Sequence, residues 1–177
     1  MNISSFLPLG RVYTRPAGRR NFRGSSGERI LNDCALRRLP VTLLAFDLDH
    51  FKKINDRYGH KTGDDVLRSF AEVTRASIET NAILARIGGE EFAALLPDYD
   101  SHRAKELGEI IASRFATMSH IADGHRIRAT VSIGLATSSP EMTSLTDLLA
   151  AADHALYRAK SQGGDQAALA GAAQRSG

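Results

Sequence analysis

Hydrophobic and polar positions alternate along the chain in blocks whose spacing predicts a series of helices and strands. Short apolar runs predict strands, which span 41–46, 82–87, 91–96 and 127–136. Apolar residues that recur at helical spacing predict helices, which span 28–39, 51–57, 63–78, 100–118 and 144–159. The same spacing assigns Leu36, Phe70, Ile110 and Phe115 to core-facing positions.

The order of these elements predicts the fold class. A hairpin between two strand runs, with helices between the other strands, favours an α+β fold over a doubly wound sheet. We expect a central, mostly antiparallel sheet of about five strands with helices packed around it. The segment after Gly164 is predicted to add an edge strand. One domain is expected over 28–168, preceded by a flexible linker at 1–27 and followed by a disordered tail at 169–177.

Composition narrows the class of protein. Of the 177 residues, 42% are apolar and 24% are charged, as in ordinary globular domains. The net charge is +3, and the arginines of residues 11–23 lack interleaved aromatics, which favours a solvated linker over a nucleic-acid arm. Cys34 is the only cysteine, so no intrachain disulfide forms and a reducing compartment is expected. No apolar run approaches the roughly 18 residues of a membrane span. We expect a cytoplasmic domain without membrane insertion, with or without an upstream sensor.

Two acidic clusters carry the candidate chemistry. Gly88 and Gly89 separate the arms of the predicted hairpin, because glycine accepts the positive φ angles of tight turns and lets a ligand approach the backbone. Glu90 and Glu91 follow this turn, and Asp47 follows the first predicted strand. Mg²⁺ usually takes one or two carboxylates together with phosphate oxygens. If the strand and the hairpin share one sheet, Asp47 with Glu90 or Glu91 supplies that set.

Further motifs surround these acids. They are Phe46-Asp47-Leu48-Asp49-His50-Phe51-Lys52, Ile54-Asn55-Asp56, Tyr58-Gly59-His60, Gly63-Asp64, Gly88-Gly89-Glu90-Glu91-Phe92, Thr130-Val131-Ser132-Ile133-Gly134 and Ala152-Asp153-His154-Ala155-Leu156-Tyr157-Arg158-Ala159-Lys160. In this order and spacing they resemble the GGDEF family of diguanylate cyclases, which condense two GTP molecules into cyclic di-GMP. The match runs from about Leu43 to Lys160, and Glu at the third signature position resembles the GGEEF variant.

The resemblance implies a nucleotidyl cyclase, or palm-like, fold and a role for each matched residue. The implied ligands of Mg²⁺, or of Mn²⁺, are Asp47, Glu90 and the carbonyl of Leu48. The implied catalytic residues are Glu90, Glu91 and Lys52. The implied guanine readers are Asn55 and Asp64, and the other implied GTP-binding residues are Phe51, His60, Gly88, Gly89 and Lys160. The implied partners are GTP and a second copy of the domain, since one domain with one GTP forms half of the active site.

The chain departs from the family pattern in three regions. Its lead-in is reduced to Thr14, Arg19, Arg20 and Phe22. Glu79 and Ala82 occupy the positions of the product-inhibition motif Arg-x-x-Asp, so that form of feedback is expected to be absent. Gly164 replaces an expected basic residue, which predicts the loss of one triphosphate contact. The alternatives are a non-catalytic receptor for GTP or cyclic di-GMP, a structural or dimerising module, and a cyclase that closes a ring on a single nucleotide.

Overall fold

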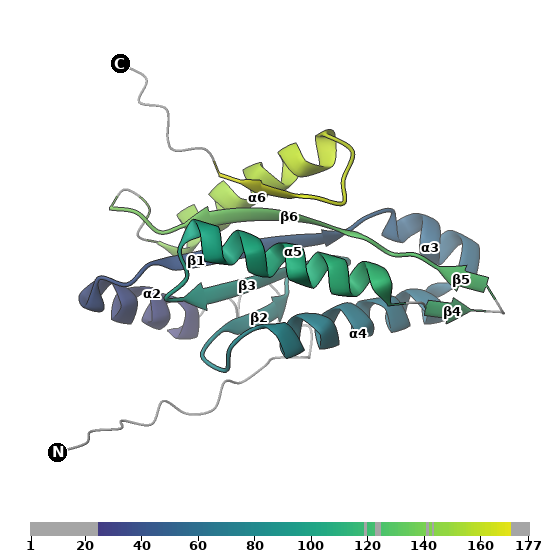
Figure 1. The fold of residues 1–177 in the computed structure, drawn as a ribbon, viewed down its shortest axis with the longest axis horizontal. Helices are drawn as coiled ribbons and strands as arrows, with labels where there is room; N and C mark the ends of the chain where they lie inside the picture. Colours follow the sequence, from purple (N-terminus) through teal and green to yellow (C-terminus); the bar gives the residue numbers. More distant parts are fainter. Residues whose placement is uncertain (1–24, 119, 123–124, 141, 143, 171–177) are drawn as a thin grey trace.

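The structure of the protein, a computed structural model, describes residues 25–118, 120–122, 125–140, 142 and 144–170 (Figure 1). Residues 1–24 and 171–177 lie outside this part of the chain, so most of the predicted linker (1–27) and tail (169–177) stays a prediction. Residues 25–27 are helical and Leu169 ends a strand, so both segments are shorter than predicted. Among the described residues, no helix is both long enough and apolar enough to cross a membrane.

Helices and strands form close to the predicted positions. The helices are α2 (Ser25–Arg37), α3 (Phe51–Tyr58), α4 (His60–Ser77), α5 (Ser101–Thr117) and α6 (Leu145–Ser161). The strands are β1 (Val41–Leu48), β2 (Ile83–Arg86), β3 (Glu91–Pro97), β4 (His120–Ala122), β5 (His125–Ile127), β6 (Val131–Thr137) and β7 (Ala167–Leu169). Side-chain caps start two helices: Asp100 accepts the N–H of Arg103 at 2.8 Å, and Ser144 accepts that of Asp147 at 3.1 Å.

The main sheet has five strands in the order β2-β3-β1-β6-β7. Strand β1 is central and pairs antiparallel with both β3 and β6, and β2 pairs antiparallel with β3. Only the edge pair β6–β7 is parallel within this sheet. The predicted α+β fold with a mostly antiparallel sheet is therefore confirmed, and the edge strand after Gly164 forms.

Apolar side chains cover both faces of the sheet. On one face, Phe70 of α4 lies 5.3 Å from Phe46, 4.9 Å from Phe92 and 5.1 Å from Phe115 of α5, measured between ring centroids. On the other face, α2 and α6 bury their apolar residues against alternate positions of the same strands. In Figure 1, α4 and α5 run side by side, and α6 lies on the opposite side of β6.

Helix α6 packs directly on the backbone of β6. A Cβ at Gly134 would lie 2.1 Å from the carbonyl oxygen of Ala152 and 2.4 Å from the nitrogen of Leu156, so only glycine permits this approach. The close contact brings the C-terminal end of α6 to the end of β1, where the acidic residues lie.

The structure corrects several boundaries. The strand predicted over 127–136 is interrupted, because β5 ends at Ile127 and β6 begins at Val131. Strand β5 pairs with β4 in a separate two-stranded sheet that was not predicted. Strands this short carry no periodic signal. Helices α2 and α4 begin at Ser25 and His60 rather than at 28 and 63.

Two residues predicted to face the core are exposed. Leu36 and Ile110 expose 85% and 46% of their surface, whereas Phe70 and Phe115 are buried as predicted. The face of α5 that meets the sheet is narrow, because it consists of Ala104, Gly108, Ile111 and Phe115. Helical spacing alone does not reveal how wide a face the neighbouring elements cover.

Candidate active site

The two acidic clusters meet at one end of β1. In the sheet register, Asp47 lies between Glu91 of β3 and Ser132 of β6. The N–H of Leu48 donates to the carbonyl oxygen of Glu90 at 3.3 Å. The first strand and the hairpin therefore share one sheet. The predicted pairing of Asp47 with Glu90 or Glu91 depended on this arrangement. Register thus brings the carboxylates that follow the glycine turn beside Asp47.

Lys160, near the end of α6, contacts Asp47. Its Nζ lies 2.5 Å from Asp47 Oδ1, and the lysine and aspartate side chains are 38% and 14% exposed. Apart from this ammonium, no donor among the described residues reaches that oxygen. Burial raises the pKa of Asp47, Lys160 lowers it through its hydrogen bond and charge, and the Glu90 and Asp49 carboxylates raise it further. The site therefore concentrates negative charge that Lys160 partly neutralises.

Arg86 holds the glycine turn. Its Nε donates to the carbonyl oxygens of Gly88 and Gly89 at 3.2 Å and 3.0 Å, and its Nη2 donates to that of Gly89 at 2.5 Å. The C=O and N–H of a trans peptide point in opposite directions. The N–H groups of Gly89 and Glu90 consequently face away from Arg86. Neighbouring backbone N–H groups of this kind form anion-binding concavities.

One of the two predicted reasons for the glycines, a positive φ, is wrong. The hairpin forms, but its loop spans 87–90 and neither glycine has a positive φ. Gly88 instead leaves room for Glu91, because a Cβ at Gly88 would lie 2.0 Å from Glu91 Oε2. No atom lies within 4 Å of the position that a Cβ at Gly89 would take, so the turn is open on that side.

Helices α3 and α4 form a second part of the site. Asn55 of α3 packs against Gly63 of α4, where a Cβ would lie 1.9 Å from Asn55 Oδ1 and 3.1 Å from Phe51 Cζ. Asn55 Oδ1 is buried, and no donor within the described residues reaches it. A buried acceptor without a partner costs free energy. A bound ligand with an N–H group would satisfy it.

The predicted site residues Lys52, His60 and Asp64 are exposed. Lys52 lies on α3, and His60 and Asp64 lie in the first turns of α4. Within the described part of the chain, no hydrogen bond or ion pair joins them to the carboxylates around Asp47. Their roles stay predictions.

The carboxylates suit a hard cation whose other ligands come from a nucleotide. Asp47 and Glu90 are both partly buried. Burial is the largest cause that raises the pKa of Asp47, Lys160 opposes it, and the nearby Glu90 carboxylate raises this pKa further. In the described segments, no group of three or more His, Cys, Asp or Glu side chains is arranged to hold a metal ion. Two carboxylates completed by phosphate oxygens and water are a usual set for Mg²⁺.

Two hydroxyl contacts beside the site were not predicted. Asp49 accepts hydrogen bonds from Thr130 Oγ1 at 2.8 Å and from Ser132 Oγ at 2.7 Å. The N-cap of α3 is His50, so Asp49 does not cap that helix. The available signal was the Thr-x-Ser spacing, which puts two hydroxyls on one side of an extended segment.

The family model "Diguanylate cyclase, GGDEF domain" matches residues 13–166, and the chain belongs to this family. The chain is 33% identical over 164 residues to the probable diguanylate cyclase DgcT of Escherichia coli (strain K12), an alignment that covers 92% of this chain and 35% of DgcT. It spans less than half of the length of the first curated relatives that it matches.

Solved structures match the fold. The active GGEEF domain of a diguanylate cyclase from Vibrio cholerae gives a TM-score of 0.82 at 26% identity, covering 90% of this chain and 100% of that one. The GGDEF domain of DgcB from Caulobacter crescentus, in complex with c-di-GMP, gives 0.77 at 30% identity, covering 81% and 85%. The chain therefore has the palm-like nucleotidyl cyclase fold of GGDEF domains.

Proposed function

We propose that this domain is a divalent-metal-dependent diguanylate cyclase, which converts two GTP molecules into cyclic di-GMP and two pyrophosphates. The observation that supports it most is the sheet register, in which Asp47 lies opposite Glu91 and Leu48 is bonded to Glu90. In the reaction, the 3′-hydroxyl of one GTP attacks the α-phosphorus of the other. A new P–O bond forms, the bond to pyrophosphate breaks, and the hydroxyl proton is released. The same step in the opposite direction closes the ring, so two pyrophosphates leave in all.

Catalysis of this kind consists mainly of positioning and of neutralising charge on phosphate. The N–H groups of Gly89 and Glu90, which face away from Arg86, are the proposed donors to phosphate oxygens. Lys52 and Lys160 supply positive charge. Glu91, at the exit of the turn, orients the attacking hydroxyl.

Asp47, Glu90 and the Leu48 carbonyl are the proposed ligands of Mg²⁺, or of Mn²⁺. When bound, such an ion stabilises the charge that develops on the transferring phosphoryl group. Lys160 already contacts Asp47, so this lysine has to share the carboxylate or leave it when a cation binds.

Asn55 and Asp64 are the proposed guanine readers, with Phe51 and His60 beside them. Guanine presents two adjacent N–H donors, and an ionised carboxylate accepts both. The buried Asn55 Oδ1, which no donor in the described residues reaches, offers a further acceptor. Adenine lacks this pair of donors, and polar sites of this type reject a mismatched partner by about 10⁴-fold.

The product joins two nucleotides symmetrically, so we propose that two copies of the domain face each other during catalysis. Feedback through the Arg-x-x-Asp position is proposed to be absent. Glu79 stands at the arginine position of that motif. It accepts a hydrogen bond from the Tyr99 hydroxyl at 3.0 Å and lies 3.9 Å from Arg103. Ala82, at the aspartate position, is buried. An anionic product would meet a carboxylate there. A cytoplasmic location, where GTP is available, and control by an upstream sensor complete the proposal.

Incubation of the purified protein with GTP and Mg²⁺, followed by separation of the nucleotides, tests this function. We expect cyclic di-GMP to accumulate and Glu90→Gln to reduce the rate by about 10³-fold, because it removes several kcal/mol of metal-dependent stabilisation. Glu109→Gln, on the exposed side of α5, is the matched control and keeps the wild-type rate. GTP binding without turnover at high protein concentration would contradict the cyclase and favour the receptor.

A further inference from the structure

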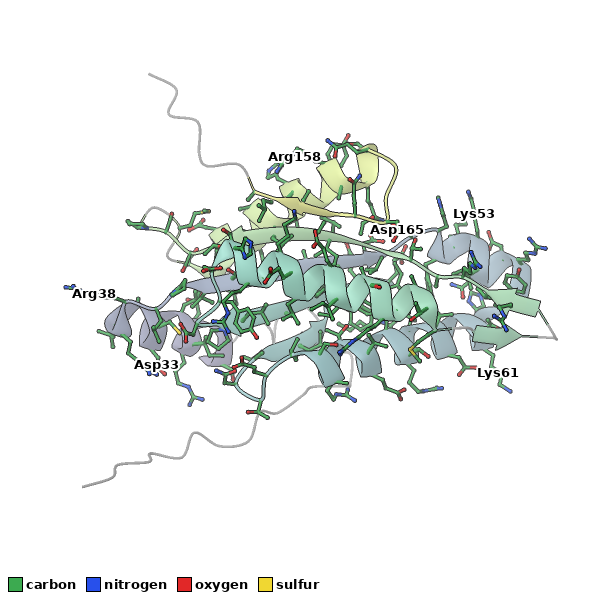
Figure 2. The ribbon with its side chains drawn as sticks, in the orientation of Figure 1. Asp33, Arg38, Lys53, Lys61, Arg158 and Asp165 are labelled. Carbon is green, nitrogen blue, oxygen red and sulfur yellow. The ribbon has the colours of Figure 1, made fainter. Side chains whose placement is uncertain are left out.

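Asp49 connects three segments that are distant in the sequence. Its Oδ2 accepts hydrogen bonds from Thr130 Oγ1 at 2.8 Å and from the N–H of Asp165 at 3.0 Å, and its Oδ1 accepts one from Ser132 Oγ at 2.7 Å. Its own N–H donates to the carbonyl oxygen of Thr130 at 2.9 Å. Asp49 therefore ties the end of β1 to the start of β6 and to the turn after α6. Figure 2 labels Asp165 in that turn.

The two hydroxyl contacts make the position of the Asp49 carboxylate well defined. Ser132 is fully buried, so its hydroxyl loses free energy unless it is hydrogen-bonded. Thr130 is half-buried and reaches the other carboxylate oxygen. Three donors therefore hold the two oxygens of Asp49, whereas Lys160 is the donor to Asp47 Oδ1.

The turn held by Asp49 is the one that ends helix α6. The N–H of Gly163 donates to the carbonyl oxygen of Lys160, and the N–H of Gly164 donates to that of Ala159, each at 3.1 Å. Gly164 has φ +75°, and a Cβ there would lie 3.0 Å from Asp49 Oδ1. Glycine at this position therefore lets the turn close onto the carboxylate. The glycine that replaces the expected basic residue at 164 therefore fits the close contact between this turn and Asp49.

We propose that Asp49 is a positioning residue, which anchors the turn at the end of α6 and thereby holds Lys160 against Asp47. The two aspartates that flank Leu48 then have separate tasks. Asp47 meets the ammonium of Lys160, and Asp49 fixes the backbone from which that lysine extends. The catalytic consequence rests on the proposed cyclase function, whereas the placement of Lys160 does not.

Comparing Asp49→Ala with Asp49→Asn distinguishes positioning from a role of the charge. The asparagine amide keeps an oxygen for Thr130 and Asp165, and its NH₂ can donate to the Ser132 hydroxyl, which rotates to accept. Alanine removes every contact. A positioning role is therefore lost in Asp49→Ala and retained in Asp49→Asn, whereas a metal ligand or a required charge is lost in both.

The direct readout is the reactivity of the Lys160 amine toward a limiting dose of an acylating reagent, measured by peptide mass spectrometry on the full chain without nucleotide. We expect severalfold higher reactivity in Asp49→Ala and in the positive control Asp47→Asn, and wild-type reactivity in Asp49→Asn. Lys53, which points away from the fold in Figure 2, is the internal control and reacts equally in all variants. Unchanged Lys160 reactivity in a folded Asp49→Ala variant would overturn the proposal.

Turnover provides a second readout. We expect Asp49→Ala to reduce kcat/KM for GTP by about 10-fold, as outer partners of an active site typically do, and Asp49→Asn to stay near wild type. In the Lys160→Ala background, Asp49→Ala should cause little further loss, because residues that act through one another are not additive. Multiplicative losses, or equal losses in Asp49→Asn and Asp49→Ala, would contradict the proposal.

A milder pair of variants covers the case in which Asp49→Ala does not fold. Thr130→Val removes one donor to Asp49, and Thr130→Ser keeps it. Lys160 should become more reactive in Thr130→Val and keep its wild-type reactivity in Thr130→Ser. Equal Lys160 reactivity in the two variants would count against the positioning role of Asp49. If the wild-type protein does not turn over GTP, the cyclase proposal fails, and the reactivity of Lys160 still decides the role of Asp49.

Discussion

Lys160 Nζ lies 2.5 Å from Asp47 Oδ1, so a side-chain cation contacts the carboxylate that is proposed to bind the metal ion. The two residues are distant in the sequence and meet because α6 packs on β6 beside β1. Lys160 thereby reduces the repulsion that Asp47 experiences from Glu90 and Asp49. The same contact places Lys160 in competition with any cation that approaches Asp47.

Replacing Lys160 should therefore strengthen metal binding in the absence of nucleotide. We expect Lys160→Met to bind Mn²⁺ about 5-fold more tightly, which corresponds to the roughly 1 kcal/mol of a partly exposed ion pair. Electron paramagnetic resonance of free Mn²⁺ measures this affinity directly. Lys53→Met, a change on the exposed side of α3, serves as the control and should bind Mn²⁺ like the wild type. Weaker binding in Lys160→Met would contradict the competition.

The raised pKa of Asp47 predicts a pH-dependent difference in stability between the wild type and Asp47→Asn. Burial raises this pKa most, Lys160 opposes the rise, and Glu90 and Asp49 add to it. Above the ordinary carboxyl pKa, about 3.9, the native state holds the proton more tightly than the unfolded state, so wild-type stability falls as pH rises. Above the raised pKa this cost is constant.

Urea denaturation in the presence of EDTA measures this effect. The free energy of unfolding of Asp47→Asn minus that of the wild type should increase as pH rises from about 4 to neutrality. A difference that is flat or that decreases with pH would contradict the raised pKa.

Arg86 should be required for the geometry of the glycine turn. Arg86→Met removes the donors to the carbonyl oxygens of Gly88 and Gly89, and we expect kcat/KM for GTP to fall by about 10²-fold, as for a small displacement of catalytic groups. Arg86→Lys keeps the charge but not the planar fork, so an intermediate loss is expected. Arg68→Met, which alters only an exposed pair with Asp65, is the control. Full activity in Arg86→Met, measured by steady-state kinetics, would exclude this role.

Gly63 should be needed for guanine recognition. In Gly63→Ala the new methyl group would lie 1.9 Å from Asn55 Oδ1, so the amide has to move. We expect a higher KM for GTP and weaker discrimination against ATP, measured by competition. Gly108→Ala is the matched control, because its methyl group would meet only Ile133 at ordinary contact distance. That variant should keep its activity and gain up to about 1 kcal/mol of stability from helix propensity. Equal KM values in the two variants would argue against Asn55 as a reader.

Much of the fold could be predicted because it depends on short-range patterns. The apolar run at β1 and the helical spacing of α4 are local signals, and both elements formed near their predicted positions. The signature residues Gly88–Glu91 identified the hairpin for the same reason. The family resemblance, which the family model then confirmed, came from the order of such local motifs.

Other features depend on contacts that local periodicity does not encode. Leu36 was predicted to be buried and is exposed, because the packing of neighbouring elements decides how much of a helical face is covered. Gly88 was expected to supply a positive φ, but it supplies space for Glu91. The β4–β5 hairpin was missed because its strands are too short to show a pattern.

The sequence by itself therefore determined which acids, amides and lysines are available, and on which kind of element each one lies. Only the tertiary structure decided which of them meet. Strand register sets Asp47 opposite Glu91, and the packing of α6 on Gly134 brings Lys160 to Asp47 and the following turn to Asp49. Backbone geometry fixes periodicity over a few residues, whereas contacts between distant segments depend on how whole elements pack to bury their apolar faces.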